Sequence, residues 1–272
     1  MSSETDAPQI TLHWLEKSRA QRILWLLEEL NVPYDIKTYK RDPKTMFADP
    51  ALQAIHPLGK APVLTIGDYT IAESAVIVEY LGEHFQSSST IIPPKWKPGL
   101  EGKLNGETEE YKRYRYFMHY AEGSLMPFIL VSLVSNDIKK APVPFFIKPI
   151  TSQISAKIMK GYVSPNYDMI VAFLEEQLAT APNGGPFLCG DKLTGADIMM
   201  SFPILVATRA TELIGMDITR ATHPNCLRMR MPSRRARATR KQWKRSLLSR
   251  ANTVWYNSIT CAVQAPADYY QF

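Results

Sequence analysis

The chain has 272 residues, of which 45% are hydrophobic and 21% charged, a composition ordinary for a globular protein of two modest domains. No apolar run approaches the roughly 18–20 residues that a membrane-spanning helix needs, and residues 1–9 are polar and acidic, unlike a secretory signal. We therefore expect a cytoplasmic protein without a transmembrane segment.

The net charge of +6 is concentrated near the C-terminus. Arg and Lys crowd residues 220–250, and Asp268 is the only acid after Asp217. The positive net charge is therefore a property of this segment and not of the globular body. We expect no nucleic-acid partner. A salt-dependent affinity lost on deletion of residues 226–272 would be the signature of such a partner.

The cysteines Cys189, Cys226 and Cys261 form no CxxC pair, and no His/Cys cluster has zinc spacing. A disulfide framework and a metal site are therefore not expected. Cys189 is expected to be a small buried hydrophobe. Glycine-rich nucleotide motifs and the HExxH zinc motif are missing from the sequence.

Residues 8–86 have the pattern of a small α/β domain in the order β-α-β-α-β-β-α. Alternating or apolar runs predict the strands, and apolar stripes at helical spacing predict the helices. Gly67-Asp68 is a hairpin turn signal. The predicted strands are 10–15, 34–39, 63–66 and 69–71, and the predicted helices are 18–30, a short one at 50–55, and 74–85.

Residues 87–103 are rich in Ser and Pro at their start and are predicted to be a linker, and residues 104–225 an all-helical domain. Helices are predicted over 106–137, 167–179 and 194–215. Two prolines exclude a regular helix at 141–147. The Pro-Phe-Phe stretch 144–146 is expected to be a packed loop, so membrane association is not favoured.

Four short motifs carry the chemical interpretation: Ser18 after the first strand, Gly59-Lys60-Ala61-Pro62 before the third, Glu73-Ser74 after the fourth, and Thr194-Gly195-Ala196-Asp197. In this element order, they resemble the glutathione S-transferase family over residues 10–225, with the fungal, theta-like, serine-type branch closest. The resemblance implies a thioredoxin-like N-terminal domain that binds glutathione and an all-α C-terminal domain that shapes the second-substrate pocket.

Ala61 and Pro62 are expected to hold the middle of glutathione, and Lys60 its glycyl end. The resemblance implies a cis bond before Pro62, beside which backbone N–H and C=O groups bind the cysteinyl part like an added strand. The alternative is an ordinary trans proline at a strand start. Lys60 is expected near the glycyl carboxylate, unless it is a solvated loop lysine, and His56, Arg41 and Lys44 are weaker candidates of the same kind.

Glu73 and Ser74 open a predicted helix, whose first N–H groups attract anions. We expect the γ-glutamyl carboxylate on Ser74 and the γ-glutamyl ammonium on Glu73. The alternative, compatible with this, is that Ser74 only caps the helix.

Ser18 is the predicted catalytic residue. Glutathione reacts as a thiolate, and a hydroxyl that donates a hydrogen bond to sulfur lowers the thiol pKa, as does the positive end of a helix. The alternative is a serine that only caps the helix.

Thr194 and Asp197 form a capping-box pattern and are expected to be structural. Most aromatic residues of the stretch 109–126 are expected in the core, with one or two facing the electrophile pocket that the resemblance places there: Tyr111, Tyr114, Tyr116, Phe117 and Tyr120.

The expected function is a homodimeric glutathione transferase that conjugates glutathione, its co-substrate, to hydrophobic electrophiles in detoxification or a secondary-metabolite pathway. One alternative is a non-catalytic glutathione-binding or regulatory protein on the same fold. Another is a glutathione-dependent peroxidase or disulfide-exchange enzyme, which ranks lower because exchange usually needs a cysteine where Ser18 stands.

Residues 226–272 form an atypical basic tail without the amphipathic helix that the family has there. It could be a nucleic-acid-binding or membrane-binding tail, a disordered segment, or the product of a reading-frame error in the gene. We favour the frame error. The genetic code permits a DNA sequence for the segment from Met231 onward that, read one base earlier, encodes an amphipathic helix with balanced charge. The messenger sequence tests this hypothesis.

Overall fold

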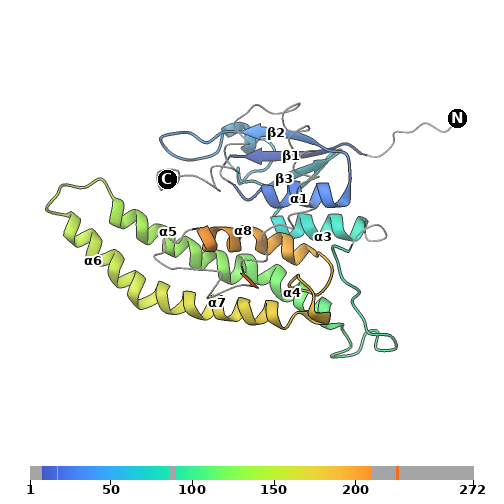
Figure 1. The fold of residues 1–272 in the computed structure, drawn as a ribbon. Helices are drawn as coiled ribbons and strands as arrows, with labels where there is room; N and C mark the ends of the chain where they lie inside the picture. Colours follow the sequence, from blue (N-terminus) through green and yellow to red (C-terminus); the bar gives the residue numbers. More distant parts are fainter. Residues whose placement is uncertain (1–7, 17, 86–89, 210–224, 227–272) are drawn as a thin grey trace. The chain divides into compact units, whose positions relative to one another are not determined.

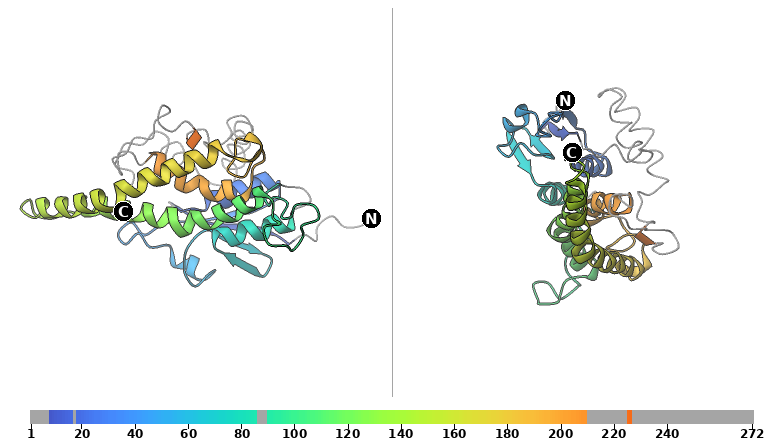
Figure 2. Two further views of the ribbon diagram at one scale, coloured as in Figure 1. Left: turned by 90° about the horizontal axis from the view of Figure 1, so that it is seen from below. Right: turned by 90° about the vertical axis from the view of Figure 1, so that its left-hand side faces the viewer.

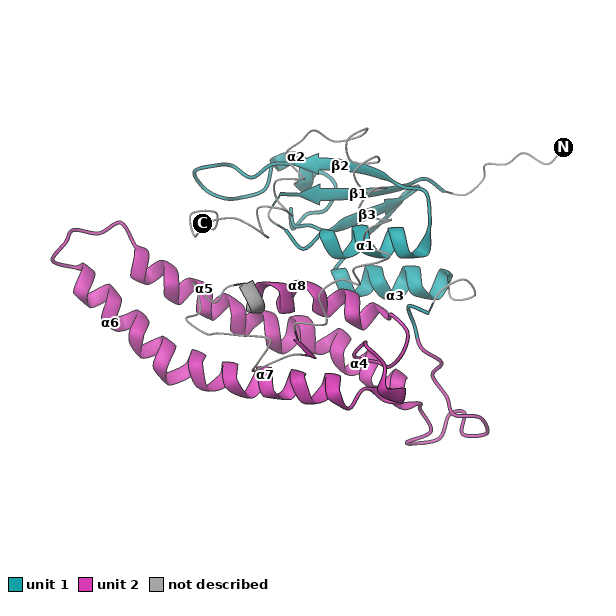
Figure 3. Cartoon of the chain, viewed as in Figure 1, with its two compact units in different colours: residues 1–92, 234–265 teal, residues 93–233, 266–272 magenta. Residues whose placement is uncertain are grey.

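The computed structural model describes residues 8–16, 18–85, 90–209 and 225–226, which fall into two compact units divided between Ile92 and Pro93 (Figure 3). This division lies inside the segment 87–103 that the sequence predicts as the linker. The predicted tail lies outside the described residues except for Cys226.

The first unit is an α/β domain with the predicted element order (Figure 1). Its strands and helices are β1 (Ile10–Leu15), α1 (Gln21–Leu30), β2 (Asp35–Tyr39), α2 (Pro50–Gln53), β3 (Val63–Ile66), β4 (Tyr69–Ala72) and α3 (Ser74–His84). Gly67 adopts φ +56° in the turn between β3 and β4, a conformation that favours glycine.

The four strands form one mixed sheet in the order β2-β1-β3-β4. Strand β1 is parallel to β2 and antiparallel to β3, which is antiparallel to β4. Helices α1 and α3 pack against each other, and their apolar residues join those of the strands in the core. Fully buried members include Leu12, Ile23, Leu26, Leu27, Leu64, Ile77 and Val78.

A buried histidine links three strands of this sheet. The His13 ring, on β1, shares hydrogen bonds with the Tyr39 hydroxyl at 2.8 Å and the Thr65 hydroxyl at 3.2 Å. Burial, helped by the nearby charge of Lys37, lowers the pKa of His13. The imidazole is therefore a neutral structural group here.

In the described residues, the second unit contains two long, interrupted helical rods, and a further helix follows the second rod. The first rod comprises α4 (Glu109–Tyr120), a π turn η1 (Ala121–Leu125) and α5 (Met126–Lys140). The second comprises α6 (Lys148–Ile158), a π turn η2 (Met159–Val163) and α7 (Ser164–Ala179). A short 3-10 turn η3 (Pro182–Gly184) leads to α8 (Gly195–Arg209), which packs against α4 and α5.

Two features of this unit differ from the sequence expectations, and a third expectation falls partly outside the described residues. The second rod begins at Lys148, about five turns before the predicted start at Tyr167, so α6 and η2 were missed. The predicted helix 194–215 is described only to Arg209. The helix Glu109–Lys140 is also long and apolar enough by composition to cross a membrane, with a mean hydropathy of 1.3 in its 18-residue window, although 44% of that window is buried.

Candidate active site

Three of the predicted motifs meet at one edge of the sheet. His13 on β1 lies opposite Val63 on β3, and Val63 lies opposite Ala72 on β4. Because these pairs are antiparallel, the segment after β1, the segment before β3 and the segment after β4 come together at the same edge. They carry, respectively, Ser18, residues 60–62 and residues 73–74.

The segment before β3 has backbone hydrogen-bonding groups that are not paired within the described residues. The Ala61–Pro62 peptide bond is cis, in agreement with the expectation from the resemblance. Pro62 is buried, Ala61 is half-buried and Lys60 is exposed. Within the described residues, the N–H and C=O groups of Ala61 form no hydrogen bond, so both can pair with an extended peptide.

The start of α3 is open. Glu73 has a φ of 70°, a strained conformation for a residue other than glycine, and its side chain does not cap the helix. Ser74 is the first helical residue and is buried. Among the described residues, its hydroxyl and the N–H groups of residues 74–76 have no hydrogen-bond partner, which leaves them available to an anion.

Ser18 lies before α1 and is not its cap. The helix begins at Gln21 with Ala20 as the N-cap residue, so the predicted start at Ser18 was wrong. The half-buried Ser18 hydroxyl accepts a hydrogen bond from the Ala20 N–H at 3.2 Å. In the described part of the chain its own proton has no acceptor, and it remains available for donation to another group.

Arg41, a weaker candidate for the glycyl carboxylate, is used locally. Its guanidinium donates to the Glu16 carbonyl at 3.1 Å and to the Met46 carbonyl at 2.8 Å. These bonds hold the loop between β2 and α2, so Arg41 acts as a structural residue. Of the other weaker candidates, Lys44 is exposed and His56 half-buried.

Comparison with known proteins gives the family. Residues 18–84 match the family model of the glutathione S-transferase N-terminal domain. The chain is 34% identical over 206 residues to glutathione S-transferase 1 of Saccharomyces cerevisiae, covering 74% of this chain and 81% of the relative. This chain belongs to the glutathione S-transferase family.

Two further comparisons agree with this assignment. Glutathione S-transferase 3 of Schizosaccharomyces pombe is 36% identical over 200 residues, with 74% of this chain and 75% of the relative covered. A solved glutathione S-transferase from Actinobacillus pleuropneumoniae matches with a TM-score of 0.55 at 28% identity, covering 81% of this chain and 85% of that one. The predicted fold and enzyme class of this transferase are confirmed, whereas the serine-type branch stays a prediction.

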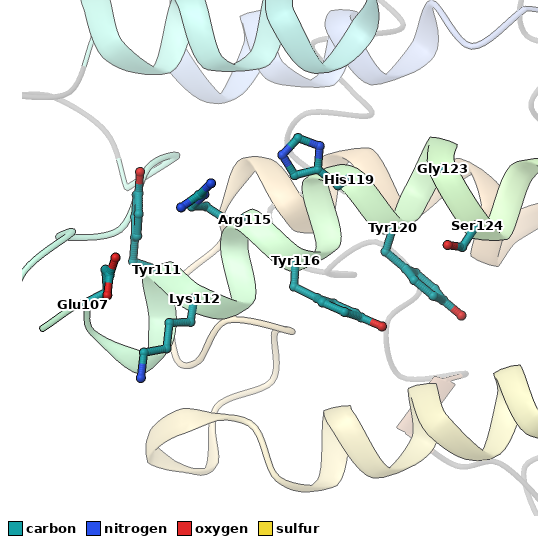
Figure 4. A pocket seen from close by; sticks show the side chains of 9 residues that line it. All are labelled: Glu107, Tyr111, Lys112, Arg115, Tyr116, His119, Tyr120, Gly123 and Ser124. Carbon is teal, nitrogen blue, oxygen red and sulfur yellow. The ribbon is translucent and has the colours of Figure 1, made fainter. Parts of the chain in front are cut away.

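The helical unit of the transferase has an open groove of about 560 Å³ along one face of α4 and η1 (Figure 4). Of the aromatic residues in this stretch, Tyr114 and Phe117 are buried in the core. The groove is lined by Glu107, Tyr111, Lys112, Arg115, Tyr116, His119, Tyr120, Gly123 and Ser124. The sequence interpretation missed the basic side chains, although the spacing 112, 115 and 119 places them on one helix face.

Two of the aromatic rings that line the groove stack on each other. The rings of Tyr116 and Tyr120 stack with centroids 5.5 Å apart and an angle of 18° between their planes, and Phe173 of α7 lies 5.8 Å from Tyr116 and 5.6 Å from Tyr120. Burial, with the neighbouring Tyr116, raises the pKa of Tyr120 to about 12, so its hydroxyl stays protonated. Such a surface can hold a planar apolar molecule.

Thr194 and Asp197 close the start of α8. One oxygen of the Asp197 carboxylate accepts from the Thr194 N–H at 2.9 Å and the Thr194 hydroxyl at 2.7 Å, and the other accepts from the Leu188 N–H at 2.9 Å. Burial raises the pKa of Asp197 to about 6 against the opposing effect of these donors. The carboxylate therefore serves the fold.

The described cysteines are poor candidates for redox chemistry. Cys189 and Cys226 are both buried, and burial raises the pKa of the Cys226 thiol to about 12 and raises that of Cys189 further. Neither forms a thiolate readily at neutral pH. In the part of the chain that the structure describes, no group of three His, Cys, Asp or Glu side chains could hold a metal.

Proposed function

We propose that this protein binds glutathione along the sheet edge described above, ionises its thiol with the help of Ser18, and adds the thiolate to apolar electrophiles. The observation that carries the proposal is the convergence, at one edge, of three sets of unused hydrogen-bonding groups: the Ser18 hydroxyl proton, the Ala61 backbone and the start of α3. Family membership supports it.

Each set suits one part of glutathione. The exposed N–H groups at the start of α3 and the Ser74 hydroxyl would bind the γ-glutamyl carboxylate, with the exposed Glu73 carboxylate beside its ammonium group. The Ala61 N–H and C=O would pair with the cysteinyl backbone. Lys60 would lie near the glycyl carboxylate.

Ser18 would act on the sulfur. A hydrogen bond from its hydroxyl stabilises the thiolate more than the thiol and so lowers the thiol pKa from its ordinary value of about 8.5. The proton released in this ionisation leaves to solvent. The sulfur lone pair then forms the bond to the electrophilic carbon, and in a chloroaromatic substrate the chlorine departs as chloride with the electron pair of its broken bond to carbon. Disulfide exchange at the described thiols is disfavoured because Cys189 and Cys226 are buried.

The second substrate is proposed to be an apolar, planar electrophile that rests on the aromatic groove of α4. The stacked pair Tyr116 and Tyr120 provides its contact surface, and the basic residues Lys112 and Arg115 at the groove would favour substrates with nitro or carboxylate groups. A homodimer, which the family resemblance implies, stays a prediction. Sedimentation measurements would test it.

The decisive experiment is titration of the thiol of bound glutathione, followed by the ultraviolet absorbance of the thiolate. In the wild type we expect a thiol pKa of about 6.5–7.5, and in Ser18→Ala a value close to the ordinary one of about 8.5. Conjugation of a chloronitroaromatic electrophile near pH 6.5 should fall about 10-fold or more in the same variant. Ser18→Thr, which retains a hydroxyl, should recover part of both effects.

Ser152→Ala, on α6 in the other unit, is the matched control and should change neither value. An unchanged thiol pKa in Ser18→Ala would remove Ser18 from the mechanism. Glutathione binding without conjugation would favour the non-catalytic alternative. The absence of calorimetric heat with millimolar glutathione would overturn the proposal as a whole.

A further inference from the structure

The hairpin of α5 and α6 has three buried serines. Ser135 and Ser155 are buried between the two helices, where the Ser135 hydroxyl lies 3.1 Å from the Ser155 hydroxyl and 3.3 Å from the Ser155 carbonyl oxygen. Ser132 is also buried and donates to the Phe128 carbonyl at 3.0 Å. Small serines let the helices approach closely, a packing common between helices in membranes.

Several large apolar side chains of the same helices are exposed. Val134 on α5 and Ile150 on α6 are each 57% exposed. Leu130 and Ile154, one turn away on the respective helices, are exposed as well. The hairpin therefore carries more apolar surface on its outside than a helix pair packed in the core of a protein.

The turn of the hairpin carries two exposed phenylalanines. Phe145 is 83% and Phe146 65% exposed, so the expectation of a packed loop was wrong. The loop backbone is nevertheless ordered by its own hydrogen bonds, from the Val143 N–H to the Ala141 carbonyl and from the Ile147 N–H to the Pro144 carbonyl. Within the helical unit, the turn lies beyond the last described residues of α8 (Figures 1 and 2).

After Asp137, in the last turn of α5, the charges around the turn of the hairpin are all positive. Between Asp137 and Asp168 the sequence contains no acidic residue, and its charged residues are Lys139, Lys140, Lys148, Lys157 and Lys160. Lys139 and Lys140 end α5, and Lys148 begins α6, so three of the five flank the phenylalanines. Exposed aromatic rings bordered by lysines match the chemistry of an anionic lipid surface.

We propose that the turn of the α5–α6 hairpin docks this protein on anionic membranes. Phe145 and Phe146 enter the interfacial region of the bilayer, and Lys139, Lys140 and Lys148 contact the lipid headgroups. A symmetric contact between two copies through this turn would bring like charges together, whereas a negative lipid surface is complementary to them. The proposal concerns attachment to the surface and does not depend on the glutathione site.

The experiment measures co-sedimentation of the full chain with vesicles. Vesicles of phosphatidylcholine with about 30% phosphatidylserine should bind the wild type, and vesicles of phosphatidylcholine alone should bind it at least about 10-fold more weakly, with a strong dependence on salt. Phe145→Ser with Phe146→Ser should weaken binding on the order of 30-fold. The triple change Lys139→Gln, Lys140→Gln and Lys148→Gln should weaken it about 100-fold.

Matched controls change the same residue types elsewhere. Phe47, which is also exposed, lies in the first unit, and Phe47→Ser should leave vesicle binding unchanged. The triple change Lys97→Gln, Lys103→Gln and Lys192→Gln removes the same charge from other exposed positions and should weaken binding less than 3-fold, an order-of-magnitude limit. The basic segment 220–250 is present in every variant, so it cannot cause the differences between them.

Several outcomes would overturn the proposal. One is a wild type that does not sediment with anionic vesicles. Another is equal vesicle binding by the variants at the turn and by their matched controls, which would assign the lipid affinity to another part of the chain. A third is a variant at the turn that alters the sedimentation velocity of the protein without altering vesicle binding, which would identify the turn as a contact between two copies of the chain. Circular dichroism and glutathione binding confirm that each variant is folded.

Discussion

Two helix starts in this chain are built in opposite ways. At α8, Asp197 accepts three hydrogen bonds, two from Thr194 and one from Leu188, so the backbone donors near the helix start are occupied. At α3, the residue before the helix provides no side-chain cap, and the Ser74 hydroxyl has no partner among the described residues. One start is closed by the protein itself, and we propose that glutathione closes the other.

The difference separates residues that hold the fold from residues that we propose hold a substrate. Leaving helix N–H groups unpaired costs stability, and the strained φ of Glu73 adds a cost on the order of 1–3 kcal/mol. Such costs are consistent with a binding role, since bound glutathione would supply the missing acceptors. Substitutions at the two starts should therefore affect different measurements.

The largest effect is expected from Asp197→Ala. Removing this carboxylate leaves the buried N–H groups of Leu188 and Thr194 without acceptors, which should lower the free energy of unfolding by about 4 kcal/mol. Urea denaturation measures the change. Asp191→Ala, an exposed carboxylate in the same loop, should cost less than about 0.5 kcal/mol. A loss below about 1 kcal/mol for Asp197→Ala would contradict the structural role of the closed start.

The stability of the folded chain should also depend on pH through the carboxyl group of Asp197. Burial raises the pKa of Asp197 from 3.8 to about 6, so between these values the folded chain keeps a proton that the unfolded chain releases. Raising the pH from about 4 to 6 should therefore lower the stability of the wild type by about 2 kcal/mol relative to Asp197→Asn, which cannot titrate. Thermal or urea unfolding across this range measures the difference, and parallel curves would contradict the raised pKa.

The smallest effect on stability, and the clearest on binding, is expected at the open start. Ser74→Ala should weaken glutathione binding by about 10-fold, because it removes a donor to the γ-glutamyl carboxylate, and should change the free energy of unfolding by less than about 0.5 kcal/mol. Isothermal calorimetry and urea denaturation measure the two quantities.

Thr108→Ala is the reciprocal control for Ser74→Ala. The Thr108 hydroxyl accepts from the Tyr111 N–H at 3.1 Å and so caps α4. Its loss should cost about 1 kcal/mol of stability and leave glutathione affinity unchanged. If instead Ser74→Ala lowered stability and spared affinity, the distinction between the two helix starts would be lost.

The sequence predicted the first unit well because its signals are local and strong. The alternating run 10–15 and the apolar run 63–66 became strands with the predicted bounds, and the cis bond at Pro62 agrees with the family resemblance. The start of α1 was misplaced because Ser18, a favoured cap residue, stands two positions before the actual N-cap Ala20.

The second unit was less predictable. The run 148–158 contains Ser, Thr and Ile residues with weak helix propensity and lacks a strong apolar stripe facing inward, so α6 was missed. The signal that could have found it is Pro149 in the first helical turn. The exposure of Phe145 and Phe146 also escaped prediction, because an apolar pair in a loop is ordinarily buried. Whether α3 begins with an open or a closed cap depends on the backbone of Glu73, which no sequence pattern revealed.

The two π turns have a consequence for how the helical rods could vary in length. A π turn accommodates one residue more than the α-helix on either side of it. Loss of one residue within Ala121–Leu125 or Met159–Val163 would convert the turn to ordinary α-helix and leave the following side chains on their present faces. The same deletion inside α4 or α7 would rotate every later residue by about 100° and turn buried side chains towards water. These turns are therefore the positions where an insertion or deletion between related chains is best tolerated.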